Sequence, residues 1–591
     1  MSFINEIKLI LVHLMIKERE RMKRMRKPVI EFENFSFQYR VQSSPTLKNI
    51  NLTIYEGEKV VIVGPSGSGK STIAHCINGL IPNIYKGTTS GTFKIKGQNA
   101  LKHNIFERSA HVGTVLQNPD DQFIGLTVGE DIAFKLENLV VPQQEMIETV
   151  QKVAQLVNVD SHLTYSPHQL SGGQKQRVTL AGVLVDDIDI LLFDEPLANL
   201  DPAAGLHTMT LIDEIHTKTN KTIVMIEHRL EDVLYKKVDR IIVVNQGEIV
   251  ADLTPNELLA SSLLQEVGIR EPLYVTALKY AGCEISEDMN PESLETMNLT
   301  TCTDSVKKWF LNASSYLPEE KQQVILEFKN VSFGYQMNQK TLKDISFKIH
   351  RGEMVSIVGK NGAGKSTISK LISGFYQPTA GGIEFKGQDL SNQTIKERAE
   401  KIGLVMQNPN QMISKTMIFD EVAFGLRIRG IDEEEVKRRV FETLKVCGLY
   451  PYRNWPISAL SFGQKKRVTI ASILVLNPEI LILDEPTAGQ DLKHYTEIME
   501  FLKTLNARGI TILMITHDMH LMLEYTTRAL VITNGELVAD DTTWHVLTND
   551  ALIKTAHLKR TSLYELAKKV GDLPPVEFIC KFISSDKAVR T

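Results

Sequence analysis

Two segments of the chain fit the pattern G-x-x-x-x-G-K-[ST], and this pattern constrains the fold more than any other feature of the sequence. Each segment follows an apolar, β-branched run, Val60–Val63 or Val355–Val358, and leads into a helical pattern. Glycines let backbone N–H groups close around phosphate oxygens, and the positive end of the following helix adds to the attraction. We therefore expect two phosphate-binding loops, each between a strand and a helix.

These loops supply most of the candidate nucleotide-binding residues. The first contains Gly64, Pro65, Ser66, Gly67, Ser68, Gly69, Lys70, Ser71 and Thr72. The second contains Gly359, Lys360, Asn361, Gly362, Ala363, Gly364, Lys365, Ser366 and Thr367. We expect Lys70 and Lys365 to reach the β- and γ-phosphates, and Ser71 and Ser366 to ligate Mg²⁺.

Further motifs follow each loop in the same order, which indicates a duplicated domain. The recurring pairs are Gln117 and Gln407, Ser171 and Ser461, Asp194 and Asp484, and His228 and His517. Each copy is long enough to bury its own core and opens with a strand pattern, Val29–Phe37 or Ile325–Phe333. We expect an N-terminal extension (1–27), a first nucleotide-binding domain (28–270), a linker (271–323), a second domain (324–550) and a helical tail (551–591). In the linker and the tail, Leu273, Ala277, Leu278, Leu563, Leu566 and Ala567 fall at helical spacing.

The composition gives no sign of a nucleic-acid binder, because the net charge is −4 and charged residues make up 23% of the chain. Five scattered cysteines without metal-ligand spacing favour a reducing compartment. The apolar run Leu9–Ile16 is far shorter than the ~20 residues of a membrane-spanning helix, and its basic cluster follows it, the reverse of a secretory signal. The opening segment is either a membrane-surface helix or an extension upstream of a start at Met22 or Met25.

An apolar run that ends in two carboxylates occurs in each copy, at Ile190–Pro196 and Ile480–Pro486. Such a run is typical of a buried parallel strand. Asp194 and Asp484 are expected to hold Mg²⁺ at the strand's carboxyl end. Glu195 and Glu485 are expected to polarise a water for in-line attack on phosphate.

Between each phosphate-binding loop and the apolar run with two carboxylates, the chain carries a segment that we call the signature. It reads LSGGQKQR at Leu170–Arg177 and LSFGQKKR at Leu460–Arg467, and here the chain resembles the ABC ATPase superfamily. The serine and the glutamine form an S-x-x-Q capping box, which predicts a helix start and therefore a second anion site. The candidate residues are Ser171, Gly172, Gly173, Gln174, Ser461, Gly463 and Gln464. Within one domain this helix start has no phosphate to bind, so we expect the two domains to pair head to tail.

The resemblance also implies roles for residues that lack a distinctive pattern of their own. Gln117 and Gln407 match the glutamine loop, which contacts Mg²⁺, and Asn199–Asp201 and Gly489–Asp491 match the loop that links the two sites. His228 and His517 match the histidine that contacts the γ-phosphate. Tyr39 and Tyr335 match the aromatic residue that stacks on adenine, although edge-strand tyrosines are an alternative interpretation.

Finer features are similar to the ATPases of energy-coupling factor (ECF) transporters. These features are the extended glutamine loops, Gln117–Gln122 and Gln407–Gln411, the segment Glu227–Asp232 and the repeated tails. The whole length resembles fused, two-domain members of that family. The resemblance implies α/β domains with a β-subdomain and a helical insertion, and ATP hydrolysis that drives uptake of a vitamin or cofactor precursor. It also implies a transmembrane coupling subunit, a membrane substrate-binding subunit and a location on the cytoplasmic face of the cell membrane.

Two other functions compete with this interpretation. A soluble ABC-F translation factor also has two domains, but it usually carries a long basic linker for RNA, whereas residues 283–304 are acidic here. A fused sugar-importer ATPase is the second alternative, against which the glutamine loops argue.

Two features predict how the copies differ and what they bind. Asp120, Asp121, Glu130 and Asp131 form an acidic stretch beside the first glutamine loop, and Asp420 and Glu421 lie beside the second. We expect basic helices of a membrane partner to dock there, and a solvated acidic face is the alternative interpretation. Phe462 replaces a glycine of the second signature, so we expect the site that receives it, with Lys70 and Glu195, to hydrolyse ATP more slowly.

Overall fold

The computed structural model describes residues 26–198, 200–315, 323–336, 340–487 and 490–590, without the side chains of Phe462 and Arg590. Packing divides the chain into two units. Unit 1 comprises Met1–Asn199, Gly205–Glu271 and Ser286–Ser293, and unit 2 comprises Leu200–Ala204, Pro272–Ile285 and Leu294–Thr591. The expected N-terminal extension lies almost wholly outside the described residues, and the boundaries of the five expected segments remain predictions.

Unit 1 is built on a six-stranded sheet in the order β10-β9-β3-β8-β7-β6. Its strands are β3 (Lys59–Val63), β6 (Val112–Val115), β7 (Ile190–Asp194), β8 (Thr222–Ile226), β9 (Arg240–Asn245) and β10 (Glu248–Leu253). Neighbours pair in parallel except β9 with β10. Every residue of β3 and β8 is buried, as expected for parallel strands covered on both faces.

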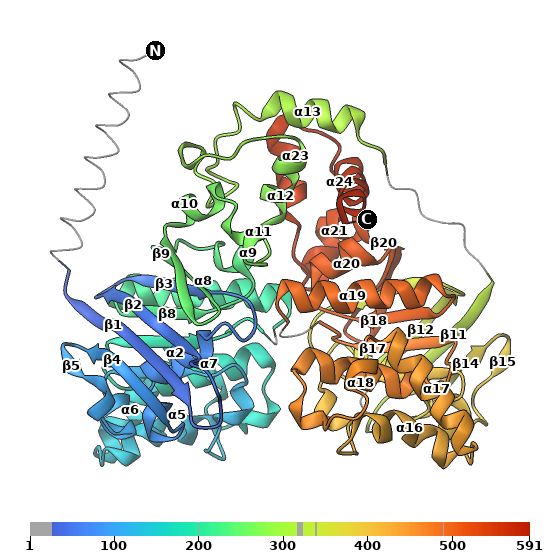
Figure 1. Cartoon of the computed structure of the whole chain (residues 1–591), viewed down its shortest axis with the longest axis horizontal. Coiled ribbons are helices and arrows are strands. Elements are labelled where there is room, and N and C mark those ends of the chain that lie inside the picture. The colour runs from blue at the N-terminus through green and yellow to red at the C-terminus, as the bar shows by residue number, and fades with distance from the viewer. Residues whose placement is uncertain (1–25, 199, 316–322, 337–339, 488–489, 591) are drawn as a thin grey trace. The chain divides into compact units, whose positions relative to one another are not determined.

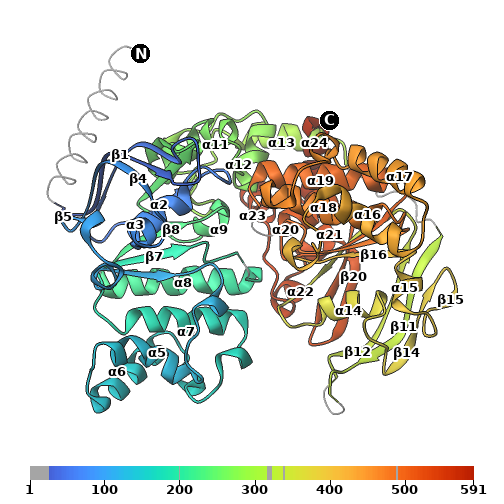
Figure 2. The ribbon, with the colours of Figure 1, turned by 60° about the horizontal axis from the view of Figure 1, so that its bottom comes forward.

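A second, antiparallel sheet and a group of helices complete unit 1 (Figure 1). The sheet runs β2-β1-β4-β5, with β1 (Pro28–Tyr39), β2 (Leu47–Tyr55), β4 (Gly87–Ile95) and β5 (Gln98–Asn99). Figure 2 shows α5 (Val128–Asn138), α6 (Gln143–Leu156) and α7 (Gly172–Leu184) grouped at one end of the unit, and each packs against the other two. These parts are the expected β-subdomain and helical insertion.

Unit 2 repeats this plan, with sheets in the orders β16-β17-β18-β13-β19-β20 and β12-β11-β14-β15. The larger sheet contains β13 (Met354–Val358), β16 (Ile402–Val405), β17 (Ile480–Asp484), β18 (Thr511–Ile515), β19 (Arg528–Thr533) and β20 (Glu536–Thr542). The smaller contains β11 (Val324–Phe333), β12 (Leu342–His350), β14 (Ala380–Phe385) and β15 (Gln388–Asp389), and the helical group is α16 (Ile418–Ile428), α17 (Glu433–Val446) and α18 (Phe462–Leu474). The predicted α/β class with two tandem domains is confirmed.

The linker and tail of the chain contribute a helical cluster to unit 2. It contains α12 (Leu273–Tyr280), α13 (Thr303–Asn312), α23 (Ser562–Gly571) and α24 (Pro575–Arg590). Helix α23 packs against the other three, and the Tyr280 hydroxyl donates to Asp586 over 2.8 Å. All six apolar residues expected at helical spacing are buried. Helix α13 was not expected from the linker sequence; its buried residues are Val306 and Phe310, one turn apart. In the described part of the chain, no helix has both the length and the apolarity needed to cross a bilayer.

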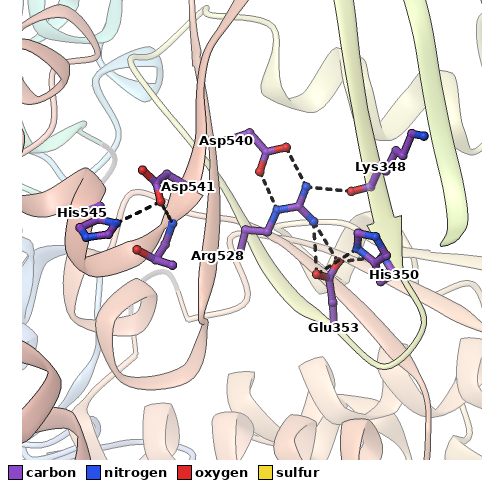
Figure 3. A network of polar contacts seen from close by, with 8 residues as sticks. Lys348, His350, Glu353, Arg528, Asp540, Asp541 and His545 are labelled. Atoms are coloured by element: carbon purple, nitrogen blue, oxygen red, sulfur yellow. Dashed lines mark hydrogen bonds and ion pairs between the residues drawn. The ribbon is translucent and has the colours of Figure 1, made fainter. Parts of the chain in front are cut away.

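A buried arginine joins the two sheets of unit 2 (Figure 3). The Arg528 guanidinium on β19 donates to both carboxylate oxygens of Asp540 on β20, over 2.6 and 2.7 Å. It also donates to Glu353 over 3.0 Å and to the Lys348 carbonyl of β12 over 2.9 Å. Because β12 belongs to the smaller sheet, this one side chain fastens the β-subdomain to the larger sheet. Arg240 does the same in unit 1, with Asp252, Glu58 and the Thr53 carbonyl of β2.

Replacing Arg528 by methionine should destabilise unit 2, because Asp540 and Glu353 lose their cationic partner inside the protein. We expect the free energy of unfolding to fall by about 3 kcal/mol, as for a broken buried ion pair. Urea unfolding and faster hydrogen exchange in β12 would measure the loss. The matched control is Arg438→Met, which removes exposed ion pairs with Glu435 and Glu442 and should leave the unfolding curve nearly unchanged. Equal losses of unfolding free energy in the two variants would contradict the role of Arg528 in joining the two sheets.

Candidate active site

The phosphate-binding loop of each unit leads from a buried strand into a helix. In unit 1, β3 leads to α2 (Lys70–Ile77), and in unit 2, β13 leads to α14 (Lys365–Ile372). Gly67 and Gly362 have φ of 75° and 76°, and a Cβ built on either would meet no atom within 4 Å. Each loop therefore has a glycine in the left-handed conformation that faces open space. Such a loop forms a cradle that suits a phosphate group.

The loop lysines point along the inner side of these cradles. Lys70 Nζ donates to the carbonyls of Gly64 and Pro65, both over 2.9 Å. Lys365 Nζ donates to the carbonyls of Gly359 and Lys360 over 2.8 and 2.9 Å. Both lysine side chains are buried, so each ammonium group is held against its own loop, where a phosphate would be bound.

The carboxylates after β7 and β17 lie at the carboxyl ends of these strands. Glu195 and Glu485 have φ of 49° and 48°, a left-handed conformation that costs a non-glycine residue about 1 kcal/mol. The backbone N–H of Glu195 donates to the Ile226 carbonyl over 3.0 Å, and that of Glu485 to Ile515 over 2.9 Å. The turn is thus pinned to the neighbouring strand, and backbone strain at a site of chemistry is a recognised sign of function.

This turn brings each glutamate to the histidine that follows the neighbouring strand. His228 Nε2 lies 3.0 Å from Glu195 Oε1, and His517 Nε2 lies 3.4 Å from Glu485 Oε1. In unit 1 the amide of Gln117 also donates to Glu195 Oε2 over 2.6 Å. The structure therefore brings together three residues that the sequence separates widely.

The electrostatic surroundings distinguish the adjacent carboxylates. Burial and the charge of Glu195 raise the pKa of Asp194 to about 6. Burial acts to raise the pKa of Glu195 as well, but the hydrogen bond and charge of His228 outweigh it and lower that pKa. Glu195 is therefore the carboxylate that stays ionised and able to accept a proton. In unit 2, burial raises the pKa of Asp484 and lowers that of Lys365 to about 8.

Residues of the β-subdomain and the helical insertion complete the candidate set. The hydroxyls of Tyr39 and Tyr335 lie 3.2 and 3.1 Å from Thr72 Oγ1 and Thr367 Oγ1, so both rings stand beside the loop helices. Ser171 and Ser461 cap α7 and α18, each in a capping box with the following glutamine, which confirms the predicted helix starts. Asn199 and Gly489 lie outside the described residues.

Sequence reasoning assigned no role in the site to Glu227, which precedes the histidine of unit 1. This carboxylate is buried and accepts hydrogen bonds from the backbone of Leu197 over 2.8 Å and of His228 over 3.0 Å. It therefore connects the turn after Glu195 to the histidine. The only sequence signal was a carboxylate directly after an apolar strand. The matching residue of unit 2 is Thr516.

Replacing Glu227 by alanine should slow the ATP hydrolysis that the resemblance implies, because the Leu197 and His228 N–H groups lose their acceptor. A buried unsatisfied donor costs about 1–3 kcal/mol, so we expect kcat to fall about tenfold while ATP still binds. Steady-state hydrolysis and nucleotide titration measure the two quantities. Glu248→Ala, on the exposed side of β10, is the control. An unchanged kcat would show that Glu227 does not position the histidine.

Comparison with known proteins agrees with the site. The family described as "ABC transporter" matches residues 47–198 and 342–488, and that described as "ATP-binding cassette cobalt transporter" matches residues 261–333. An ABC transporter ATP-binding protein of Clostridium perfringens (strain 13 / Type A) is 62% identical over 565 residues, which cover 96% of this chain and 100% of the relative. One of Enterococcus faecalis (strain ATCC 700802 / V583) is 60% identical over 567 residues, with the same coverage. The chain therefore belongs to the ABC transporter family, as an ATP-binding protein and ATPase with two fused nucleotide-binding domains.

Proposed function

We propose that the chain is the motor of an ECF-type importer that takes up a cofactor precursor. It would bind two membrane subunits, one for coupling and one for substrate, at the cytoplasmic face of the cell membrane. The observation that carries the proposal is the match of residues 261–333 to a family described as an ATP-binding cassette cobalt transporter, between two cassettes that each hold a full set of site residues. The same match includes the acidic part of the linker, residues 283–304. A soluble ABC-F translation factor would need a basic linker there to bind RNA.

The site residues support an in-line attack of water on the γ-phosphate. Glu195 and Glu485 would accept the proton of the attacking water, while His228 and His517 hold these carboxylates in place and contact the γ-phosphate. Lys70 and Lys365 would move from the loop carbonyls to the β- and γ-phosphates.

The oxygen donors near the phosphates fit Mg²⁺. The Ser366 hydroxyl hydrogen bonds to the Asp484 carboxylate, so these two oxygens already converge, and hydroxyl and carboxylate oxygens are ligands that Mg²⁺ prefers. Ser71 with Asp194, and Ser366 with Asp484, would hold the ion, together with Gln117 and Gln407. Bound there, Mg²⁺ would neutralise charge that develops on the phosphates.

Head-to-tail pairing is proposed because the helix start at Ser171 or Ser461 has no phosphate to bind within its own domain. In such a pair the first loop, with Lys70 and Glu195, receives the signature that contains Phe462.

The pairing predicts unequal sites. Glu485→Gln should lower steady-state hydrolysis much more than Glu195→Gln, because the site with Phe462 lacks the glycine that lets the signature backbone approach phosphate. We expect a difference of about tenfold, measured in the assembled transporter. Phe462→Gly should raise hydrolysis in the Glu485→Gln background. Equal losses, or a larger loss from Glu195→Gln, would contradict the asymmetry as assigned.

The docking surface expected for the membrane partner is less acidic than the sequence indicates. Glu130 accepts from the backbone of Leu126 and Asp131 from that of Ile124, so both carboxylates cap local backbone. Asp120 pairs with Lys175 over 2.6 Å. In unit 2, Glu421 accepts from the backbone of Ser414 and Lys415, and Asp420 pairs with Arg427.

The exposed surface beside the first glutamine loop also carries apolar side chains. Ile124 and Leu126 are 64% and 83% exposed. Exposed apolar side chains beside a loop that reaches Glu195 fit a protein partner. We propose that a helix of the coupling subunit covers them.

Co-purification of the tagged chain from membranes tests this function. We expect a transmembrane coupling subunit and a substrate-binding subunit to be recovered with the wild-type chain. Leu126→Asp should reduce their recovery about tenfold without loss of stability, because an apolar contact is replaced by a buried charge. Val41→Asp, exposed elsewhere on unit 1, is the control. Recovery of ribosomes and no membrane protein would refute the proposed function.

A further inference from the structure

The two nucleotide-binding domains, called here the first and the second cassette, hold their glutamine loops in different ways. Two paired positions differ in chemistry: Gln122 of the first loop corresponds to Met412 of the second, and Gln176 of α7 corresponds to Lys466 of α18. All four side chains lie on the loop itself or on the helix that the signature begins. The difference therefore concerns the connection between the glutamine loop and the signature helix.

In the first cassette the loop is closed by its own side chain. Gln122 accepts from the Leu116 backbone over 2.9 Å and donates to the Thr114 carbonyl over 3.1 Å. Gln176 is directed elsewhere, since it donates to the Pro196 carbonyl and accepts from Thr208 over 2.8 Å. Thus, among the described residues, Gln176, the residue of α7 in this comparison, makes no hydrogen bond to the backbone of the glutamine loop.

The link between α7 and the first loop is an ion pair. Lys175 Nζ lies 2.6 Å from Asp120, with the aspartate side chain 48% exposed. Solvent and salt screen such a pair. The matching residues of the second cassette are Lys465 and Asn410, which cannot form an ion pair.

In the second cassette a buried lysine takes over the connection. Lys466 is 1% exposed and donates to the Gln407 carbonyl over 2.6 Å and to the Met406 carbonyl over 3.1 Å. Met412 can offer only a weak sulfur acceptor to the Met406 N–H.

The surroundings partly offset the burial of this ammonium group. An ion inside a protein needs hydrogen-bond partners and opposite charge. The two carbonyls supply the acceptors. Burial lowers the pKa of Lys466, and the negative charges of Asp484 and Glu485 oppose this shift. Lys466 therefore binds the backbone of the glutamine loop and lies within range of the charges of Asp484 and Glu485.

We propose that Lys466 is a positioning residue, which fixes the backbone of Gln407 relative to the signature helix α18 and to the carboxylates of the second site. Lys466 and Met412 form the set of the second cassette, and Gln176 and Gln122 form the set of the first. In each set, one residue lies on the signature helix and the other on the glutamine loop. The second glutamine loop is thus held by a buried link that salt does not screen, whereas the first depends on an exposed ion pair.

Exchange of the sets tests the proposal in the full-length ATPase, with Glu195→Gln present so that turnover reports the second site. Lys466→Gln alone should lower kcat about tenfold and change the KM for ATP less than twofold, because the Gln407 carbonyl loses its donor while the phosphate loop is untouched. Lys466→Gln combined with Met412→Gln installs the set of the first cassette and should restore kcat to within about threefold. Lys465→Met, one residue earlier on the same helix, is the matched control and should leave kcat unchanged.

The rescue separates positioning from simple loss of fold, since damage to the core would not be repaired by a second substitution in the loop. Lys466→Met provides an independent arm, because it keeps an unbranched apolar side chain of nearly the same length and removes every donor. It too should lose about tenfold in kcat at an unchanged melting temperature. A kcat of Lys466→Met equal to wild type would overturn the proposal. So would a double variant no more active than Lys466→Gln.

Discussion

The parallel pairing of β3, β8 and β7 is the constraint on which the site depends. Ile226 pairs with Ile62 on one side and with Asp194 on the other, so the three strands end at the same edge of the sheet. The phosphate loop, the paired carboxylates and His228 each lie at the carboxyl end of one of these strands. Their meeting is therefore a result of register and not of local sequence, and unit 2 repeats it through β13, β18 and β17. Ligands in open α/β sheets bind at this edge for the same reason.

Most of this arrangement could be predicted from the sequence because it depends on local patterns. Apolar runs such as Ile190–Asp194 identify buried strands, glycines at fixed spacing identify the phosphate loops, and the box of Ser171 with Gln174 identifies a helix start. Once the strands are known to be parallel, the meeting of Glu195 with His228 follows. The class of the fold and the identity of the enzyme were accessible in this way.

What the sequence could not supply is the choice of partner for polar side chains. Glu130 and Asp131 are acidic residues of an expected docking surface, yet they bind the backbone of their own helix start and loop. Glu227 carries no motif of its own, and its bonds to two separate turns exist only in the folded sheet. Helix α13 has too short an apolar stripe to stand out, and it is stabilised by packing against the tail. The roles of the site residues and the pairing of the domains remain predictions.

The arginines that join the two sheets limit which parts of each nucleotide-binding domain can move relative to one another. Arg240 and Arg528 tie β2 and β12, which are strands of the smaller sheets, to the sheet that carries the phosphate loop. We therefore expect the two sheets of one domain to move as a single body. The helical insertion α5–α7 is joined to the larger sheet through the glutamine loop, before α5, and through the segment between α7 and β7. Any movement of the insertion relative to the larger sheet therefore has to occur at these two connections.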